Sequence, residues 1–153
     1  MATYTLDDLV NAVHDDVATA ASLERDESQA EDEITEGIHD WPLIQTWMAG
    51  NRGTSFESDT DRLTLSGKHS VKEYLIYSDL YVAQRSHVGE AMGKLLSTIN
   101  EIEDILDTRT YDLYGADYIT SFNWSWDQVT FEYGGVKYTG ARFSIIIRAG
   151  TTR

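Results

Sequence analysis

Two groups of side chains in the sequence have types that could bind a ligand. The run SDTD contains Asp59 and Asp61, two carboxylates at a spacing found in calcium loops. The glycine and the terminal glutamate of such a loop are missing and Arg62 follows, so we favour a solvated acidic loop. Trp124 and Trp126 alternate in a β-type run and could stack on bases or sugars, but alternating aromatic residues more often belong to a core.

The other reactive residues form no catalytic or metal-binding pattern. The four histidines lie in unrelated segments without HxxxH or HxH spacing, and the chain has no cysteine. No phosphate loop, dinucleotide fingerprint or serine-nucleophile motif occurs. With 26 acidic residues, chance carboxylate pairs are unavoidable and none identifies a general acid and base. We therefore predict no catalytic residues, no metal, no cofactor and no enzyme activity.

The chain is strongly acidic. Its 26 Asp and Glu residues against 12 Lys and Arg residues give a net charge of −14, which opposes binding to nucleic-acid phosphates. The low lysine content fits either a protein that works in concentrated salt or an ordinary acidic protein. No apolar run approaches the roughly 20 residues that span a bilayer, and the N-terminal residues do not resemble a secretory signal, so we expect no membrane partner.

Hydrophobic periodicity predicts one domain over residues 1–153. The expected elements are a helix over about 6–21, a strand over 43–49, a strand over 71–83, a helix from 88 to about 106, strands over 118–126 and 129–133, and a closing strand after a turn at Gly134 and Gly135. The acidic segment 24–40 is expected to be a frayed helix ending near Gly37 or a mobile linker. The glycine- and serine-rich segment 50–67 is expected to be an extended arm or loop.

This element order predicts an α+β fold, a two-layer sandwich in which one mainly antiparallel sheet carries helices on one face. The uncovered face would then present aromatic, apolar and arginine side chains, a composition typical of protein interfaces. The predicted interface residues on it are Tyr77, Tyr81, Arg142, Ile146 and Arg148. We expect the two arginines to pair with acidic residues across a subunit boundary; the alternative is that both are solvated.

The element order and two longer segments resemble one protein family. An amphipathic helix and a Trp-Pro pair entering a strand precede the polar segment 50–67. Residues 74–96 then run from a strand directly into a helix, and residues 129–149 form a closing hairpin. Together these features resemble the tail-terminator family of long-tailed phages and archaeal viruses.

The resemblance implies a structural virion protein that forms a ring, usually six-fold. Such a ring caps the completed tail tube, stops its polymerisation and faces the neck of the head. Its partners would be further copies of itself, the tail-tube protein and a neck or head-completion protein, and DNA would pass through without specific binding. The protein would be made in the host cytoplasm and reside in the virion at the head–tail junction.

Segment 50–67 would be the arm that engages the tube or a neighbouring subunit, with Phe56 as its apolar anchor. Deleting residues 51–66 should then leave the fold intact but abolish joining to tubes. The acidic segment 24–40 is longer than the family pattern leads us to expect. Head-closure and tail-completion neck proteins have overlapping element orders and remain an alternative. A stand-alone acidic binding module that mimics nucleic acid is another.

Overall fold

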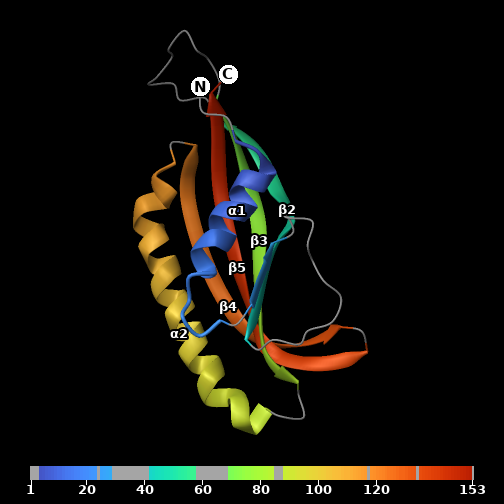
Figure 1. Cartoon of the computed structure of the whole chain (residues 1–153). Helices are drawn as coiled ribbons and strands as arrows, with labels where there is room; N and C mark the ends of the chain where they lie inside the picture. Colours follow the sequence, from blue (N-terminus) through green and yellow to red (C-terminus); the bar gives the residue numbers. More distant parts are fainter. Residues whose placement is uncertain are drawn as a thin grey trace.

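The structure, a computed structural model, describes most of the chain. The described residues are 4–23, 25–28, 42–57, 69–84, 88–116, 118–133 and 135–152. They form one five-stranded sheet with two helices, α1 and α2, packed on the same face (Figure 1). The predicted two-layer α+β fold is confirmed.

The first helix, α1 (Leu6–Val17), begins where the sequence predicts. The Asp8 backbone N–H donates to Thr5 Oγ1 at 3.1 Å, and the Thr5 N–H donates to Asp8 Oδ2 at 2.9 Å. This reciprocal cap satisfies two of the amide donors that a helix start leaves without partners. The helix ends at Val17, earlier than expected, because the Thr19 N–H turns back to the Asp16 carbonyl in a tighter turn.

The sheet follows the order β1-β2-β3-β5-β4. Its strands are β1 (Arg25–Ser28), β2 (Leu43–Glu57), β3 (His69–Gln84), β4 (Ile119–Tyr133) and β5 (Val136–Thr152). Only β1 and β2 run parallel, and every other neighbouring pair is antiparallel. Strands β4 and β5 form a hairpin, and Gly135 in its turn adopts a φ of 79°.

Two predictions for the first half of the chain are wrong. Residues 25–28 of the acidic segment form β1 rather than helix, and the Gln45 side-chain amide of β2 donates to Glu27 at 2.9 Å in the interior. Residues 50–57 of the expected arm belong to β2 and pair with β3, with bulges near Gly50 and Gly53. In the sequence, a glycine at a β-bulge looks the same as a glycine in a loop, and this stretch was therefore expected to be an arm. The remaining residues of both segments lie outside the described part.

The second half of the chain is more regular than expected. Helix α2 (Val88–Asp112) runs past residue 106 and ends in a 3₁₀ turn (Leu113–Gly115). The two short strands predicted over 118–133 are one strand, β4, because the residues between them stay paired with β5. Gly134 of the expected turn lies outside the described residues.

The main core fills the space between the helices and the sheet. It contains fully buried side chains from both layers: Leu9, Val13 and Val17 of α1, Leu95, Ile102 and Leu106 of α2, and Ile76, Leu80, Phe143, Ile145 and Ile147 of the sheet. Burying one such side chain contributes roughly 1.5–3 kcal/mol to folding. The alternating pattern predicted for β5, with residues 143, 145 and 147 inside, is therefore correct.

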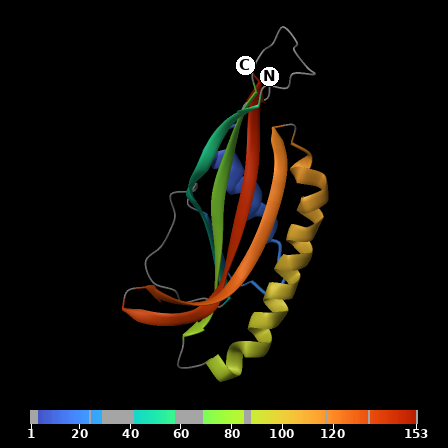
Figure 2. The ribbon, with the colours of Figure 1, turned by 180° about the vertical axis from the view of Figure 1, so that it is seen from behind.

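The hairpin end of β4 and β5 curves away from α2 (Figures 1 and 2). A second, smaller apolar cluster forms there from Leu43, Tyr81, Phe131 and Tyr138. Gly140 permits the close approach of β5 to β3 in this region, because a Cβ atom at this position would lie 1.7 Å from the Leu80 carbonyl oxygen.

The beginning and the end of the described chain meet at the opposite end of the sheet. The ring of Tyr4 stacks on Tyr118 with 5.2 Å between centroids, and the Gly150 N–H donates to the Tyr118 carbonyl at 2.8 Å. Figure 1 shows both chain ends at this position.

Candidate interaction surface on the open face of the sheet

The face of the sheet opposite α1 and α2 is called the open face here. In the part of the chain that the structure describes, no helix packs on it (Figure 2). Strand alternation directs onto it the side chains of Trp47 from β2, Tyr77 and Asp79 from β3, and Arg142 and Ile146 from β5. These residues come from three adjacent strands and lie side by side.

A charge pair lies at the centre of the open face. The Asp79 carboxylate accepts from Arg142 Nε at 2.8 Å and from Arg142 Nη2 at 3.1 Å. Trp47 Nε1 donates to the same carboxylate at 3.0 Å. The side chain of Asp79 is only 3% exposed and that of Arg142 is 34% exposed. A carboxylate so buried requires this compensation, since removing an ion from water costs several kcal/mol.

Aromatic rings surround the Arg142 guanidinium. Its central carbon lies 4.3 Å from the ring centre of Tyr77, 5.5 Å from that of Phe131 and 5.7 Å from that of Trp47. Stacking on aromatic faces adds cation–π attraction to the ion pair. The hydrogen bonds that Arg142 donates to Asp79, more than any other contact, raise the pKa of Arg142 above its ordinary value. The pair is therefore a fixed structural element with one exposed edge.

A second, weaker pair lies towards the end of the sheet that carries the chain termini. Arg148 Nε is 3.8 Å from Glu73 Oε2, beyond hydrogen-bonding distance, and both side chains are substantially exposed. Half-buried Leu75 and Ile146 lie between this pair and Tyr77, and the two are cross-strand partners. The open face thus combines balanced charges with exposed apolar and aromatic area.

The helical layer has the opposite character. Lys94 and Arg109 are the only Lys and Arg residues of α1 and α2. The carboxylates of the two helices are those of Asp7, Asp8, Asp15, Asp16, Glu90, Glu101, Glu103, Asp104, Asp107 and Asp112. The two helices are therefore strongly negative, whereas the two arginines of the open face each lie beside a carboxylate.

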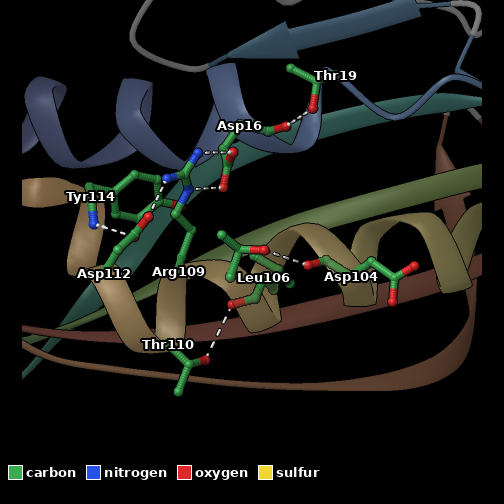
Figure 3. Close-up of polar contacts among 9 residues, drawn as sticks. Asp16, Thr19, Asp104, Leu106, Arg109, Thr110, Asp112 and Tyr114 are labelled. Carbon is green, nitrogen blue, oxygen red and sulfur yellow. Dashed lines mark hydrogen bonds and ion pairs between the residues drawn. The ribbon is translucent and has the colours of Figure 1, made fainter.

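One cluster joins the two helices (Figure 3). Arg109 of α2 donates to both oxygens of Asp16 in α1, at 2.9 and 3.0 Å, and to Asp112 at 2.8 Å. Its guanidinium also lies 5.1 Å from the ring centre of Tyr114. The pKa of Arg109 is raised, chiefly by Asp16. The cluster ties α2 to α1, so we assign it a structural role.

The structure changes the interpretation of several predicted interface residues. Arg142 pairs with Asp79 of its own chain, not with an acidic residue across a subunit boundary as expected. Tyr81 is 5% exposed and belongs to the small cluster beneath the hairpin, so it is not available at the surface. Tyr77 and Ile146 remain accessible on the open face, and Arg148 lies at its margin. The side chain of Phe56 lies outside the described residues.

Three central residues were not among the predicted site residues: Trp47, Asp79 and Phe131. The alternation of β3 places Asp79 on the same face as Tyr77, so a carboxylate within an aromatic strand was the available signal. Trp47 and Phe131 come from distant segments, and their positions depend on strand order and on the curvature of the hairpin.

Of the two groups that the sequence suggested for ligand binding, only the two tryptophans lie in the described part of the chain. Trp124 and Trp126 pack against the main core, and Trp126 Nε1 donates to Glu103 of α2 at 3.0 Å. Asp59 and Asp61 lie outside the described residues. Among the described residues, no group of three or more His, Cys, Asp or Glu side chains is arranged to hold a metal ion.

Two further findings concern membrane-spanning helices and related proteins. Neither described helix combines the length and apolarity needed to cross a bilayer. Comparison of the sequence with known protein families and with curated proteins finds no match.

Proposed function

We infer that the chain is a structural subunit of a virus tail, a terminator that assembles into a ring, closes the tail tube and joins it to the neck. The observation that carries the inference is the open face. In a chain of net charge −14, this face balances its arginines with carboxylates and leaves Tyr77, Leu75 and Ile146 only half-buried. Such a surface suits docking onto another protein.

The order of the elements supports the same inference. The helix, two strands, helix and closing hairpin of the structure follow the order on which the resemblance rests, apart from β1, from residues 50–57, which belong to β2 and not to an arm, and from the closing strands, which are two and not three. Strand β1 lies at the edge of the sheet, where an extra strand leaves the arrangement of the others unchanged. The proposed role is structural and requires no catalytic group.

In this proposal the two layers have different tasks. The open face docks onto the tail tube or the neck protein, and Arg142 holds the aromatic side chains of that face in place. The acidic helices face away from the docked partner, and their charge repels DNA that passes nearby. Residues 50–57 of the expected arm are part of the sheet, and the rest of it lies outside the described residues.

The test combines assembly with docking. Purified protein would be measured by light scattering and negative-stain microscopy in low and high salt, alone and with tubes assembled from the tail-tube protein of the same genome. We expect rings, or rings that form only at tube ends. A persistent monomer that ignores tubes at every salt concentration would contradict the proposal.

A matched pair of variants would locate the docking surface. Ser144→Arg adds bulk to the centre of the open face, and Ser97→Arg adds the same side chain to the exposed surface of α2. We expect the first to weaken tube binding at least about tenfold and the second to change it less than about twofold. Equal effects of the two would exclude the open face as the docking surface.

The acidic helical layer favours a second candidate, a binding module that recognises a basic protein by charge. Its carboxylates outnumber the two basic residues of the helices. Such a module would bind a basic protein, lose that binding in high salt and ignore tubes. A head-closure or tail-completion protein would instead form rings that bind the neck but not the tube.

A further inference from the structure

The edge of the sheet formed by β4 is accessible. In the described part of the chain, no strand pairs with the outer side of β4. Over Ile119–Tyr133 the strand contains no proline and no lysine, and its only irregularity lies between Ile119 and Ser121. A long, regular edge strand without such protective features is a template for a further strand. The side chains exposed to solvent along its middle are those of Asn123, Ser125, Asp127, Gln128 and Thr130.

The helical side of this edge carries accessible apolar surface. Helix α2 runs alongside β4 in both views (Figures 1 and 2), and Glu103 of α2 accepts a hydrogen bond from Trp126. Leu96 lies about two turns before Glu103, on the same side of the helix, yet it is 57% exposed. On the strand, Trp124 and Trp126 point to the helical side and are only half-buried. A strand added beside β4 would cover apolar surface of all three side chains.

The charge along this edge is negative. Glu103 lies on the flank of α2 that meets β4, and Asp127 is exposed on the strand itself. Strand β4 contains neither lysine nor arginine. The two basic residues of α2 do not compensate, because Lys94 lies about two and a half turns from Glu103, on the opposite side of the helix, and Arg109 donates to Asp16 of α1. A basic partner would therefore be attracted to the edge.

The two sides of the edge would select different side chains in an added strand. Successive side chains of a strand point to opposite sides of the sheet. On the helical side, the added strand would meet Leu96 and the two tryptophans. On the other side it would meet the polar side chains that alternate with them, Asn123, Ser125 and Asp127. A segment that fits the edge therefore alternates apolar residues with polar or basic ones.

We propose that the β4 edge is a docking site for an extended segment of another protein, in which apolar residues alternate with lysine or arginine. The segment continues the sheet through main-chain hydrogen bonds to β4. Its apolar side chains cover Leu96, Trp124 and Trp126, and its basic side chains lie beside Asp127. This site is separate from the open face, and it requires neither a ring nor a tail tube.

A second copy of the chain fits this edge less well. Pairing of β4 with β4 about a two-fold axis would place two identical, negative edges together. The flank of each α2 carries Glu103 and, one turn later on the same side, Asp107. Repulsion between like charges would oppose this contact. A basic segment meets the same carboxylates with attraction, and charge complementarity therefore favours it as the occupant.

Three synthetic peptides of about eight residues, a usual strand length, test the site. The first alternates isoleucine with arginine. The second has the same composition, but its arginines are grouped at one end. The third alternates isoleucine with glutamate. Calorimetric titration into the full chain measures their affinities, and hydrogen exchange followed by NMR on isotope-labelled protein locates the bound peptide.

We expect the alternating basic peptide to bind at least about tenfold more tightly than either of the other two. Every second backbone amide of β4 should exchange more slowly when this peptide is bound, because alternate amides of an edge strand point outward. The grouped peptide carries the same charge, so it measures simple attraction to an acidic protein.

A matched pair of variants tests the position of the site. Leu96→Arg replaces the exposed apolar side chain by a cation, and Ser97→Arg adds the same side chain at the next exposed position, about 100° further around the helix. We expect the first to weaken binding of the alternating basic peptide at least about tenfold and the second less than about twofold.

Several results would overturn the proposal: no binding, equal binding of the grouped or the acidic peptide, unchanged exchange in β4, or equal effects of the two arginine variants. Protection of β4 that grows with protein concentration in the absence of peptide would identify a second copy as the occupant and would also overturn it. No tail tubes are needed, so a failure of tube binding would leave this result unaffected.

Discussion

At the scale of single residues, the buried carboxylate of Asp79 determines how the side chains of the open face are arranged. Asp79 receives three hydrogen bonds, two from Arg142 and one from Trp47. An unpaired charge at this position would be strongly unfavourable, because neither water nor another cation compensates for it. The residues that hold Asp79 therefore act as a unit, and the stability of the chain should depend on them more than on other surface residues.

Replacing Arg142 by alanine should be strongly destabilising. We expect the free energy of unfolding to fall by about 3 kcal/mol, the lower end of the range for a buried pair, because the guanidinium is partly exposed. Urea unfolding followed by circular dichroism measures the change. Arg142→Lys should recover only part of the loss, since lysine cannot make the two-pronged contact.

Arg148→Ala is the matched control, on the same strand and the same face. Its partner Glu73 lies 3.8 Å away and both side chains are exposed, so we expect a change of less than about 0.5 kcal/mol. If the two alanine variants were equally unstable, the loss would reflect packing along β5 and not the buried pair.

Two glycines should respond to alanine in opposite directions. Gly140→Ala would place a methyl group 1.7 Å from the Leu80 carbonyl oxygen, so β3 and β5 would have to separate. We expect loss of several kcal/mol, about 3 or more, or failure to fold. Gly93→Ala meets no atom within 4 Å on an exposed helix position and should stabilise by up to about 1 kcal/mol. Thermal unfolding of both variants checks the pair.

Sequence reasoning predicted residue types better than residue partners. Alternation along β3 and β5 correctly assigned inward and outward side chains, because the period of a strand is fixed by its geometry. It could not show that Arg142 faces Asp79 of the same chain, because this requires the register between strands 63 residues apart. The sequence therefore provided no reason to expect the partner of Arg142 within the same chain.

At the scale of elements, the end of α2 depends on a tyrosine. Leu113 and Tyr114 both have positive φ, 51° and 59°, in the left-handed region where side chains are strained. The Asp112 side chain accepts from the Tyr114 N–H at 3.0 Å, and Arg109 lies over the Tyr114 ring. These contacts hold the turn and position α2 against α1 through Asp16.

Alkaline pH should therefore weaken the contact between the helices. Burial, and after it the Asp16 carboxylate, raise the pKa of the Tyr114 hydroxyl above its ordinary value of 10. A raised folded-state pKa gives stability that is present below pH 10 and is lost as the pH rises above 10. We expect Tyr114→Phe to reduce the decline in unfolding free energy above that pH, by up to about 1.4 kcal/mol per pH unit.

The control for that measurement is Tyr111→Phe, because Tyr111 lies near the end of α2 and is 90% exposed. It should leave the alkaline decline unchanged, because the hydroxyl that it removes lies in solvent and not between the helices. Urea unfolding at about pH 9 and about pH 11 compares the wild type with both variants. A Tyr114→Phe curve that follows the wild type would show that this hydroxyl does not limit stability.

The elements with clear periodicity were predicted, and those held by tertiary contacts were not. Helix α1 and strands β3 and β5 followed from their apolar spacing. Strand β1 has no apolar face and is held by pairing with β2. The second half of β2 contains glycines that favour a loop locally, and pairing with β3 overrides that preference.

At the scale of the whole molecule, charge is unevenly distributed between the layers. The two helices carry ten carboxylates against two basic residues, whereas the two arginines of the open face each lie beside a carboxylate. Carboxylates spaced along two neighbouring helices repel one another, and dissolved ions reduce this repulsion over about 10 Å at 0.1 M salt. Salt should therefore act on both folding and association.

We expect the unfolding free energy and the fraction of assembled protein to rise together as potassium chloride increases from low to molar concentrations. Dissolved ions lower the repulsion between the acidic surfaces of separate copies, so screening favours assembly. Light scattering and urea unfolding along the same salt series measure both quantities. Stability or assembly that declined with salt would argue against operation in concentrated salt and would favour an ordinary acidic protein.

The positions of the chain ends have a practical consequence. Tyr4 and Gly150 both contact Tyr118 at one end of the sheet, whereas the β4–β5 turn at Gly135 lies at the other. A short peptide could therefore join the ends, and the chain could be reopened at that turn to give a circularly permuted protein. Such a protein would keep every strand neighbour while changing the order in which the strands are synthesised. Its folding rate would show whether β4–β5 pairing begins the formation of the sheet.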